Sequence, residues 1–161
     1  MAIRRVITAP HVEPIPFTKE GYDKIVAEQK QLLLDRVPAI EHLKKSRELG
    51  DLKENGYYQA SRQKVNAIDA RLRRIKFLLK YGVIKEATQS EIVEIGSSVV
   101  LFDGKAEVTY QIVGGEESNP SEGKISHRSP LGRELIGKKV GEKVSISVPV
   151  GTIIYTLKKI S

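Results

Sequence analysis

Two long stretches of helical periodicity, one directly after the other, constrain the fold of this chain most strongly. Both show apolar residues at spacings of three, four and seven, which mark one face of a helix. The first starts at the plausible N-cap Thr18, runs to about Leu49, and carries Tyr22, Ile25, Val26, Leu32, Leu33, Val37, Ile40 and Leu43. The second carries Tyr58, Ser61, Val65, Ile68, Leu72, Ile75 and Leu79.

A glycine follows each stretch, Gly50 after the first and Gly82 after the second, where helices commonly end. The sequence therefore predicts two helices of roughly 30 residues, each about 45 Å long, joined by a tight turn. Such a pair forms an antiparallel coiled-coil hairpin. Pro38 lies inside the first helix, where proline removes a backbone hydrogen bond at a cost of ~3 kcal/mol. We expect a kink or a short interruption there.

The pattern changes after Ser90 to short segments of alternating, β-branched residues at 98–102, 106–113, 144–148 and 153–157. Glycine, asparagine and proline punctuate them, which predicts an antiparallel sheet with turns. One short helix is expected around Pro130 to Ile136. The predicted fold class is α+β, with an extension over residues 1–14, a hairpin over 15–88 and a sheet domain over 89–161. The boundary itself is expected between Lys85 and Ile95.

The positive charge is confined to the first half of the chain. Residues 1–90 hold 18 Lys and Arg against 11 Asp and Glu, whereas residues 91–161 hold 9 against 9. A basic half suggests an anionic partner such as nucleic acid, although a solvated helical surface explains the same balance. The chain has no cysteine, and no segment has the length and apolarity of a signal peptide or a membrane span. A soluble cytoplasmic protein is expected.

The turn between the two helices carries two carboxylates, Asp51 and Glu54, three residues apart. One interpretation is structural: Asp51 is a good N-cap, and Glu54 at the third helical position completes a capping box. The other is functional, because Mg²⁺ is commonly held by one or two carboxylates together with waters and phosphates. Two acids cannot complete an octahedral shell. On the second interpretation, a partner enzyme supplies the remaining ligands.

Two motifs then give a specific resemblance. The run Gly50-Asp51-Leu52-Lys53-Glu54-Asn55, followed by Tyr58 and Arg62, resembles the tip of the bacterial transcript cleavage factors GreA and GreB. The second half agrees: Ile125-Ser126 and the segment from Ser129 to Glu142 resemble the signature of their C-terminal domain. The resemblance covers about residues 15 to 160, with both motifs in the expected order.

This resemblance implies a mechanism. Members of the family pair a coiled coil with an FKBP-like sheet domain that docks at the secondary channel of bacterial RNA polymerase. The coiled coil reaches down the channel, and Asp51 and Glu54 then help the polymerase to hold its second Mg²⁺ and orient the attacking water. The polymerase itself cuts the 3′ end of the backtracked nascent RNA. The chain is thus expected to be an accessory factor and a monomer, which does not bind the Mg²⁺ when free.

The same resemblance and the basic helix suggest further contacts. Docking to the polymerase is assigned to the motif residues Ser129, Pro130, Leu131 and Gly137. Contacts with RNA or the polymerase are assigned to Lys53, Asn55, Tyr57, Arg62, Arg71, Arg73 and Arg74. The arginines along the second helix are expected to guide RNA through its phosphates.

The chain departs from the family pattern directly after Asn55. Typical members have a small residue, an acid and a tyrosine, whereas this chain has Gly56-Tyr57-Tyr58. One acid of the tip is therefore missing. Two alternatives stay open, the first because of Tyr57 and the second because of the basic first half. The first is a Gre-like paralogue that occupies the channel and inhibits transcription without cleavage. The second is a basic coiled-coil protein that binds nucleic acid directly.

Overall fold

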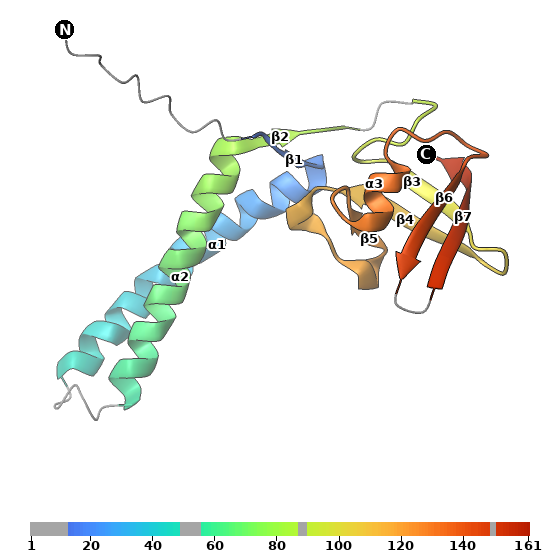
Figure 1. The fold of residues 1–161 in the computed structure, drawn as a ribbon. Helices are drawn as coiled ribbons and strands as arrows, with labels where there is room; N and C mark the ends of the chain where they lie inside the picture. Colours follow the sequence, from blue (N-terminus) through green and yellow to red (C-terminus); the bar gives the residue numbers. More distant parts are fainter. Residues whose placement is uncertain (1–12, 49–55, 87–89, 149–150) are drawn as a thin grey trace, which may run out of the picture.

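A helical hairpin and a sheet domain make up the computed structural model of the chain, which describes residues 13–48, 56–86, 90–148 and 151–161 (Figure 1). The hairpin consists of β1 (Ile15–Phe17), α1 (Lys19–Glu48), α2 (Gly56–Tyr81) and β2 (Gly82–Ile84). Strands β1 and β2 pair in parallel and join the two helices at the base. The 30 residues of α1 span about 45 Å. The predicted coiled-coil hairpin is confirmed.

Helix α1 begins where the sequence predicts and runs without interruption through Pro38. The hydroxyl oxygen of Thr18 accepts a hydrogen bond from the backbone N–H of Gly21 at 3.1 Å, so Thr18 is the N-cap. Pro38 and Leu34, whose carbonyl loses its helical donor, are both exposed. Water can therefore satisfy that carbonyl, and the helix continues.

The seam between α1 and α2 follows a heptad spacing on both helices. On α2 the predicted stripe is confirmed, with Val65, Ile68 and Ile75 buried. On α1 the heptad positions that are buried or half-buried are Tyr22, Ile25, Gln29, Leu32, Arg36, Ala39, Leu43 and Ser46, and Gly21, Val26 and Glu28 beside them are also at least half-buried. The prediction that Leu33, Val37 and Ile40 face α2 was wrong, because these side chains are exposed. Several seam positions of α1 hold polar residues. A pattern that counts only apolar residues therefore points to the neighbouring face of this helix, which is exposed.

Large side chains fill the base of the hairpin, and small ones fill the seam toward its far end. Phe17, Ile25, Ile75 and Leu78 form a buried cluster at the base. Farther along, the second cluster comprises Ala39, Val65 and Ile68. Beyond it the buried seam residues are Ser46 and Ser61. Small residues let two helices approach closely, which favours a slender end to the arm.

The sheet domain has five strands in the order β5-β4-β3-β7-β6. The elements in chain order are β3 (Ser98–Phe102), β4 (Glu107–Val113), η1 (Gly115–Glu117), η2 (Pro120–Glu122), β5 (Lys124–Ser126), α3 (Pro130–Leu135), β6 (Lys143–Val148) and β7 (Gly151–Ile160). Three neighbouring pairs are antiparallel as predicted. The β4–β5 pair is parallel, because the two 3-10 turns bring the chain back before β5 begins.

The core of the sheet domain lies between the sheet and the short helix α3. It includes Val99 and Leu101 from β3, Ile112 from β4 and Leu157 from β7, all fully buried. Leu135 of α3 is also fully buried there. The predicted helix near Pro130 to Ile136 is thus confirmed, and it anchors the signature segment of this half to the core.

Candidate functional site

The two acids lie in sequence between helix ends that are the farthest from the sheet domain. Helix α1 ends at Glu48 and α2 begins at Gly56, at the remote end of the hairpin in Figure 1. Asp51, Lys53, Glu54 and Asn55 lie outside the described residues. The capping and metal-binding interpretations of Asp51 and Glu54 therefore both stay predictions.

The first tyrosines of α2 have different surroundings. Tyr57 is 47% exposed. Tyr58 is half-buried, and the guanidinium carbon of Arg47 lies 5.9 Å from the centre of its ring. This cation–π contact joins the end of α1 to the start of α2. Tyr58 is therefore a packing residue of the hairpin, whereas the ring of Tyr57 is largely exposed.

Two arginines of the hairpin form ion pairs across the seam. Arg71 on α2 binds Glu28 on α1 in a bidentate arrangement, with Nε to Oε1 and Nη2 to Oε2 both at 2.6 Å. Arg36 on α1 binds Asp69 on α2, with Nε to Oδ1 at 2.6 Å. Bidentate arginine–carboxylate pairs fix geometry as well as charge. These pairs lock the two helices in register.

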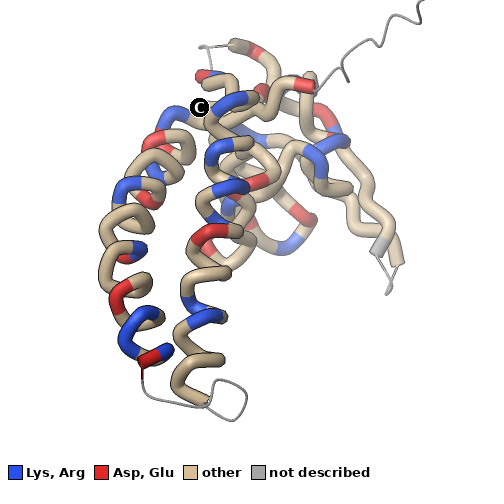
Figure 2. The backbone as a smooth tube through the Cα atoms, turned by 90° about the vertical axis from the view of Figure 1, so that its left-hand side faces the viewer, with Lys and Arg blue, Asp and Glu red and all other residues tan. Residues whose placement is uncertain are grey.

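A third pair reaches outside the hairpin, from Arg74 on α2 to Glu116 on η1 at 2.5 Å. Arg71 and Arg74, both predicted to contact RNA, are therefore engaged within the molecule. Arg62 and Arg73 are exposed and form no ion pair with other described residues. They share one face of α2 with Lys76 and Lys80, at spacings of 11, 3 and 4 residues, and we call these four residues the basic strip. Figure 2 shows the charged residues along both helices.

The ion pairs across the seam depress carboxyl pKa values. The hydrogen bonds from Arg71 lower the pKa of Glu28 from its ordinary value, and its positive charge adds to the effect. Arg36 lowers the pKa of Asp69 in the same way. A carboxyl group whose pKa is lower in the folded state stabilises the fold above its unfolded pKa, and that contribution is lost as the pH falls.

We expect Glu28→Gln to lower the free energy of unfolding at pH 7 by about 0.5 to 1 kcal/mol, a small value because both side chains are partly exposed. The difference from the parent should shrink as the pH falls below about 4.3, the unfolded pKa of glutamate. Thermal melting at pH 7 and pH 3.5 measures both effects. Glu41→Gln, an exposed site on the same helix, is the control. An equal deficit at both pH values would contradict the assignment.

The signature segment of the sheet domain has clear structural functions. The Ser129 hydroxyl accepts a hydrogen bond from the backbone N–H of Gly132 at 3.0 Å and donates one to the Ser126 carbonyl at 2.7 Å. Leu131 is partly buried against the domain core. Of the predicted docking residues, Ser129 and Leu131 thus build α3, whereas Pro130 and Gly137 are exposed.

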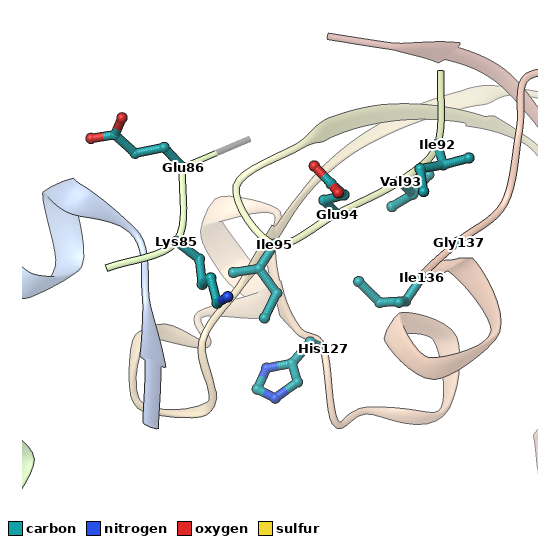
Figure 3. Close-up of a pocket in the computed structure, with 9 residues that line it drawn as sticks. All are labelled: Lys85, Glu86, Ile92, Val93, Glu94, Ile95, His127, Ile136 and Gly137. Carbon is teal, nitrogen blue, oxygen red and sulfur yellow. The ribbon is translucent and has the colours of Figure 1, made fainter. Parts of the chain in front are cut away.

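A cavity of about 450 Å³ lies beside this segment (Figure 3). Ile92, Val93, Ile95 and Ile136 give it an apolar lining, and His127 faces the same space in the close-up. The Nδ1 atom of His127 lies 3.2 Å from the Val113 carbonyl oxygen. Sequence reasoning missed this cavity, because Ile92 and Ile95 lie in the predicted boundary region and follow no periodic pattern, and Ile136 comes from a segment more than 40 residues away.

No three His, Asp or Glu side chains among the described residues gather into a site for a metal ion. None of the described helices is long and apolar enough to cross a membrane.

Two family models match the two halves of the chain in succession. The N-terminal domain of the transcription elongation factors GreA/GreB matches residues 15–84. The C-terminal domain of the same factors matches residues 88–161. The chain belongs to the GreA/GreB family. The first match contains the hairpin with its acidic turn, and the second contains the sheet domain with α3.

Two GreA proteins agree with this assignment. The transcription elongation factor GreA of Macrococcus caseolyticus is 39% identical over 141 residues, which cover 84% of this chain and 89% of that protein. GreA of Thermomicrobium roseum is 40% identical over 146 residues, covering 88% and 93%. Among solved structures, the GreA factor homolog Gfh1 of Thermus thermophilus is 27% identical, with a TM-score of 0.44 over 92% of this chain and 99% of that one.

Proposed function

We propose that this chain is a transcription elongation factor that binds bacterial RNA polymerase and stimulates the polymerase's own cleavage of backtracked RNA. The observation that carries the proposal is the combination of GreA/GreB domains with an acidic pair in the turn of the hairpin. In this role the chain is an accessory factor and not an enzyme by itself. The sheet domain docks on the polymerase, and the hairpin enters its secondary channel.

The shape of the hairpin supports entry into a channel. Helix α1 gives an arm of about 45 Å. In the seam toward the far end, the small side chains of Ala39, Ser46 and Ser61 lie among larger apolar ones such as Val65 and Ile68. Ion pairs of Glu28 with Arg71 and of Asp69 with Arg36 hold the helices together along the arm. A narrow, braced arm can carry its turn far from the docking domain.

The donor chemistry of the turn fits Mg²⁺. Asp51 and Glu54 offer hard carboxylate oxygens, which are the ligands that Mg²⁺ prefers in proteins. In the proposed complex, the ion held jointly with the polymerase supplies charge stabilisation and a more acidic bound water. Asp51 and Glu54 bring negative charge to that position, orient the water through their oxygens, and leave when the factor dissociates.

The basic strip is the proposed path of the extruded RNA. Arg62, Arg73, Lys76 and Lys80 are exposed along one face of α2, which leads back from the acidic turn toward the base. Cations at this spacing can neutralise successive phosphates of a single strand. Arg71 and Arg74 support this path indirectly, because they brace α2 against Glu28 and Glu116.

We expect the triple variant Arg62→Gln, Arg73→Gln, Lys76→Gln to reduce RNA crosslinking to the factor about fivefold in backtracked complexes. Each phosphate contact with a single strand contributes about 0.7 to the slope of log affinity against log salt concentration. The loss of three contacts should therefore lower that slope by about 2. The control Arg71→Gln should lower the melting temperature but leave crosslinking unchanged. Unchanged crosslinking in the triple variant would mean that the strip is only a solvated surface.

A second candidate function follows from Tyr57. This exposed ring stands where typical family members have an acid, and it favours an inhibitor that occupies the channel without promoting cleavage. The deciding experiment adds the chain to a stalled, backtracked polymerase complex with Mg²⁺. Shortening of the RNA from its 3′ end supports the proposed function, whereas slowed elongation without shortening supports the inhibitor. Equal affinity for free RNA and for the polymerase complex would favour a basic coiled-coil protein.

A further inference from the structure

The junction between the hairpin and the sheet domain contains a carboxylate that caps a helix of the other half. Glu117 lies in η1, directly after β4. Its Oε1 accepts a hydrogen bond from the backbone N–H of Thr18 at 2.9 Å, and its Oε2 accepts one from the Thr18 hydroxyl. Thr18 is the N-cap of α1. The start of α1 is thus held by a residue 99 positions away in the sequence.

The arrangement is a capping box in which the acid comes from another domain. In an ordinary capping box, a glutamate at the third helical position reaches back to the N–H of the N-cap residue. In α1 the third position is Gly21, which has no side chain. Glu117 accepts the same N–H instead. A negative charge at a helix N-terminus also interacts favourably with the helix dipole.

The fit around Glu117 leaves no room for side chains at two glycines. A Cβ atom on Gly21 would lie 2.0 Å from Glu117 Oε2. A Cβ atom on Gly114 would lie 2.1 Å from the carbonyl oxygen of Pro16, in the middle of β1. The N–H of Gly114 also donates to Glu117 Oε1 at 3.3 Å. The carboxylate of Glu117 therefore binds backbone groups of both halves of the protein, at a place where two segments of the chain approach closely.

Two ion pairs reinforce this junction. Arg74 on α2 binds Glu116 on η1. Lys124 on β5 binds Glu20, in the first turn of α1, at 3.2 Å. Figure 1 shows the segment between β4 and β5 beside the start of α1. The contacts reach both helices of the hairpin, so they resist rotation of the arm as well as its separation from the sheet domain.

The length of the arm makes its direction sensitive to this junction. Over about 45 Å, a rotation of about 10° at the base moves the far end by about 8 Å. Carboxylates that complete a metal site need placement within about an ångström, because such misplacements can cost about 100-fold in rate. A junction that fixes the angle between the arm and the sheet domain therefore controls whether Asp51 and Glu54 reach the metal site of the polymerase.

We propose that Glu117 is a positioning residue that fixes the direction of the arm relative to the docking domain by capping α1 across the junction. This inference rests on the proposed function for its effect on cleavage. The effect on the arm itself concerns the free protein. The direction of the arm is therefore measured in the free protein, and its effect on cleavage is measured separately in the polymerase complex.

The direction of the arm is measured in the free, full-length protein with two spin labels. The chain has no cysteine, so single cysteines at Gln63 on α2 and Lys105 in the β3–β4 turn, both exposed, accept the labels specifically. Pulsed electron spin resonance gives the distance distribution between them. We expect one narrow distribution in the parent, a distribution at least twofold broader in Glu117→Ala, and a smaller broadening in Glu117→Gln, whose amide oxygen still accepts from the Thr18 N–H. An unchanged width in both variants would overturn the proposal.

Two further variants separate capping from tethering. Gly21→Glu supplies a capping-box acid within α1 and excludes Glu117 by steric overlap, so α1 keeps its cap while the junction opens. We expect the helix content of the parent with a broadened distance distribution. Glu122→Gln, an exposed site in η2, removes the same charge from the same segment and should leave the distribution unchanged. If Gly21→Glu does not fold, the two Glu117 variants decide.

The cleavage assay completes the test. For Glu117→Ala we expect stimulated cleavage at saturating factor to fall at least tenfold, with half-saturation of the polymerase changed less than threefold. A purely structural role would instead lower the melting temperature and leave cleavage at saturation intact. If the parent itself stimulates no cleavage, the proposed function fails, while the distance measurement still decides the junction. A broadened distribution with full cleavage would overturn the positioning role.

Discussion

Asp51→Asn and Glu54→Gln are each expected to remove most of the stimulated RNA cleavage while leaving the hairpin nearly as stable as in the parent. Asparagine caps helices about as well as aspartate, and glutamine keeps the side-chain acceptor of a capping box. Both changes remove a charged oxygen that a hard cation prefers. We expect cleavage to fall by about 10- to 100-fold, the range typical of damage to a metal site.

The measurement compares RNA shortening in backtracked complexes with thermal melting and polymerase binding of the same proteins. Cleavage by both variants should recover partly at high Mg²⁺, because weak occupancy by the ion is the defect. Glu48→Gln, an exposed acid at the end of α1, is the matched control and should cleave like the parent. Parental cleavage by both folded variants would leave Asp51 and Glu54 as helix-starting residues only.

The helices were predictable because their signals are local and repeated. The apolar stripe of α2 and the Thr18 cap of α1 were both read correctly from spacing. The stripe of α1 was partly misplaced, because Arg36 occupies a seam position and only its partner Asp69 makes that burial acceptable. That partner is 33 residues away, beyond the reach of a periodicity argument.

The short strands were not predictable for a related reason. The strands β1, β2 and β5 have three residues each, too few to show an alternating pattern. They exist because a neighbouring strand offers hydrogen bonds, as β4 does for β5. The four longer strands carry enough β-branched residues to identify themselves.

The candidate site, too, was predictable from the sequence only where its signals are local. The acids of the turn and the arginines of α2 were visible as local motifs. That Arg71 and Arg74 are engaged by Glu28 and Glu116 was not visible, since these partners lie 43 and 42 residues away. The exposed cations of the basic strip therefore emerge only when the ion pairs are known.

Gly132→Ala is expected to destabilise the sheet domain strongly, although it adds only one methyl group. A Cβ atom at this position would lie 2.1 Å from the carbonyl oxygen of Ser126 and 3.0 Å from the Cα atom of His127. Both are backbone atoms, so neither can move aside without shifting a chain segment. The shift would pull α3 from β5 and loosen Leu135, which is fully buried in the core.

Overpacking of this kind costs about 1 to 3 kcal/mol, and we expect a value near the upper end because backbone is displaced. For a domain of this size, that predicts a melting temperature about 12 to 24 °C lower. Gly115→Ala is the matched control: its Cβ atom would lie 3.8 Å from the Ser126 hydroxyl, an ordinary contact, so the melting temperature should stay near that of the parent.

Because α3 also presents Pro130 and leads to Gly137, Gly132→Ala should weaken polymerase binding even where the domain remains folded. Parental melting would show that α3 can shift without loss, and the signature glycine would then need a reason outside the fold, such as direct contact with the polymerase.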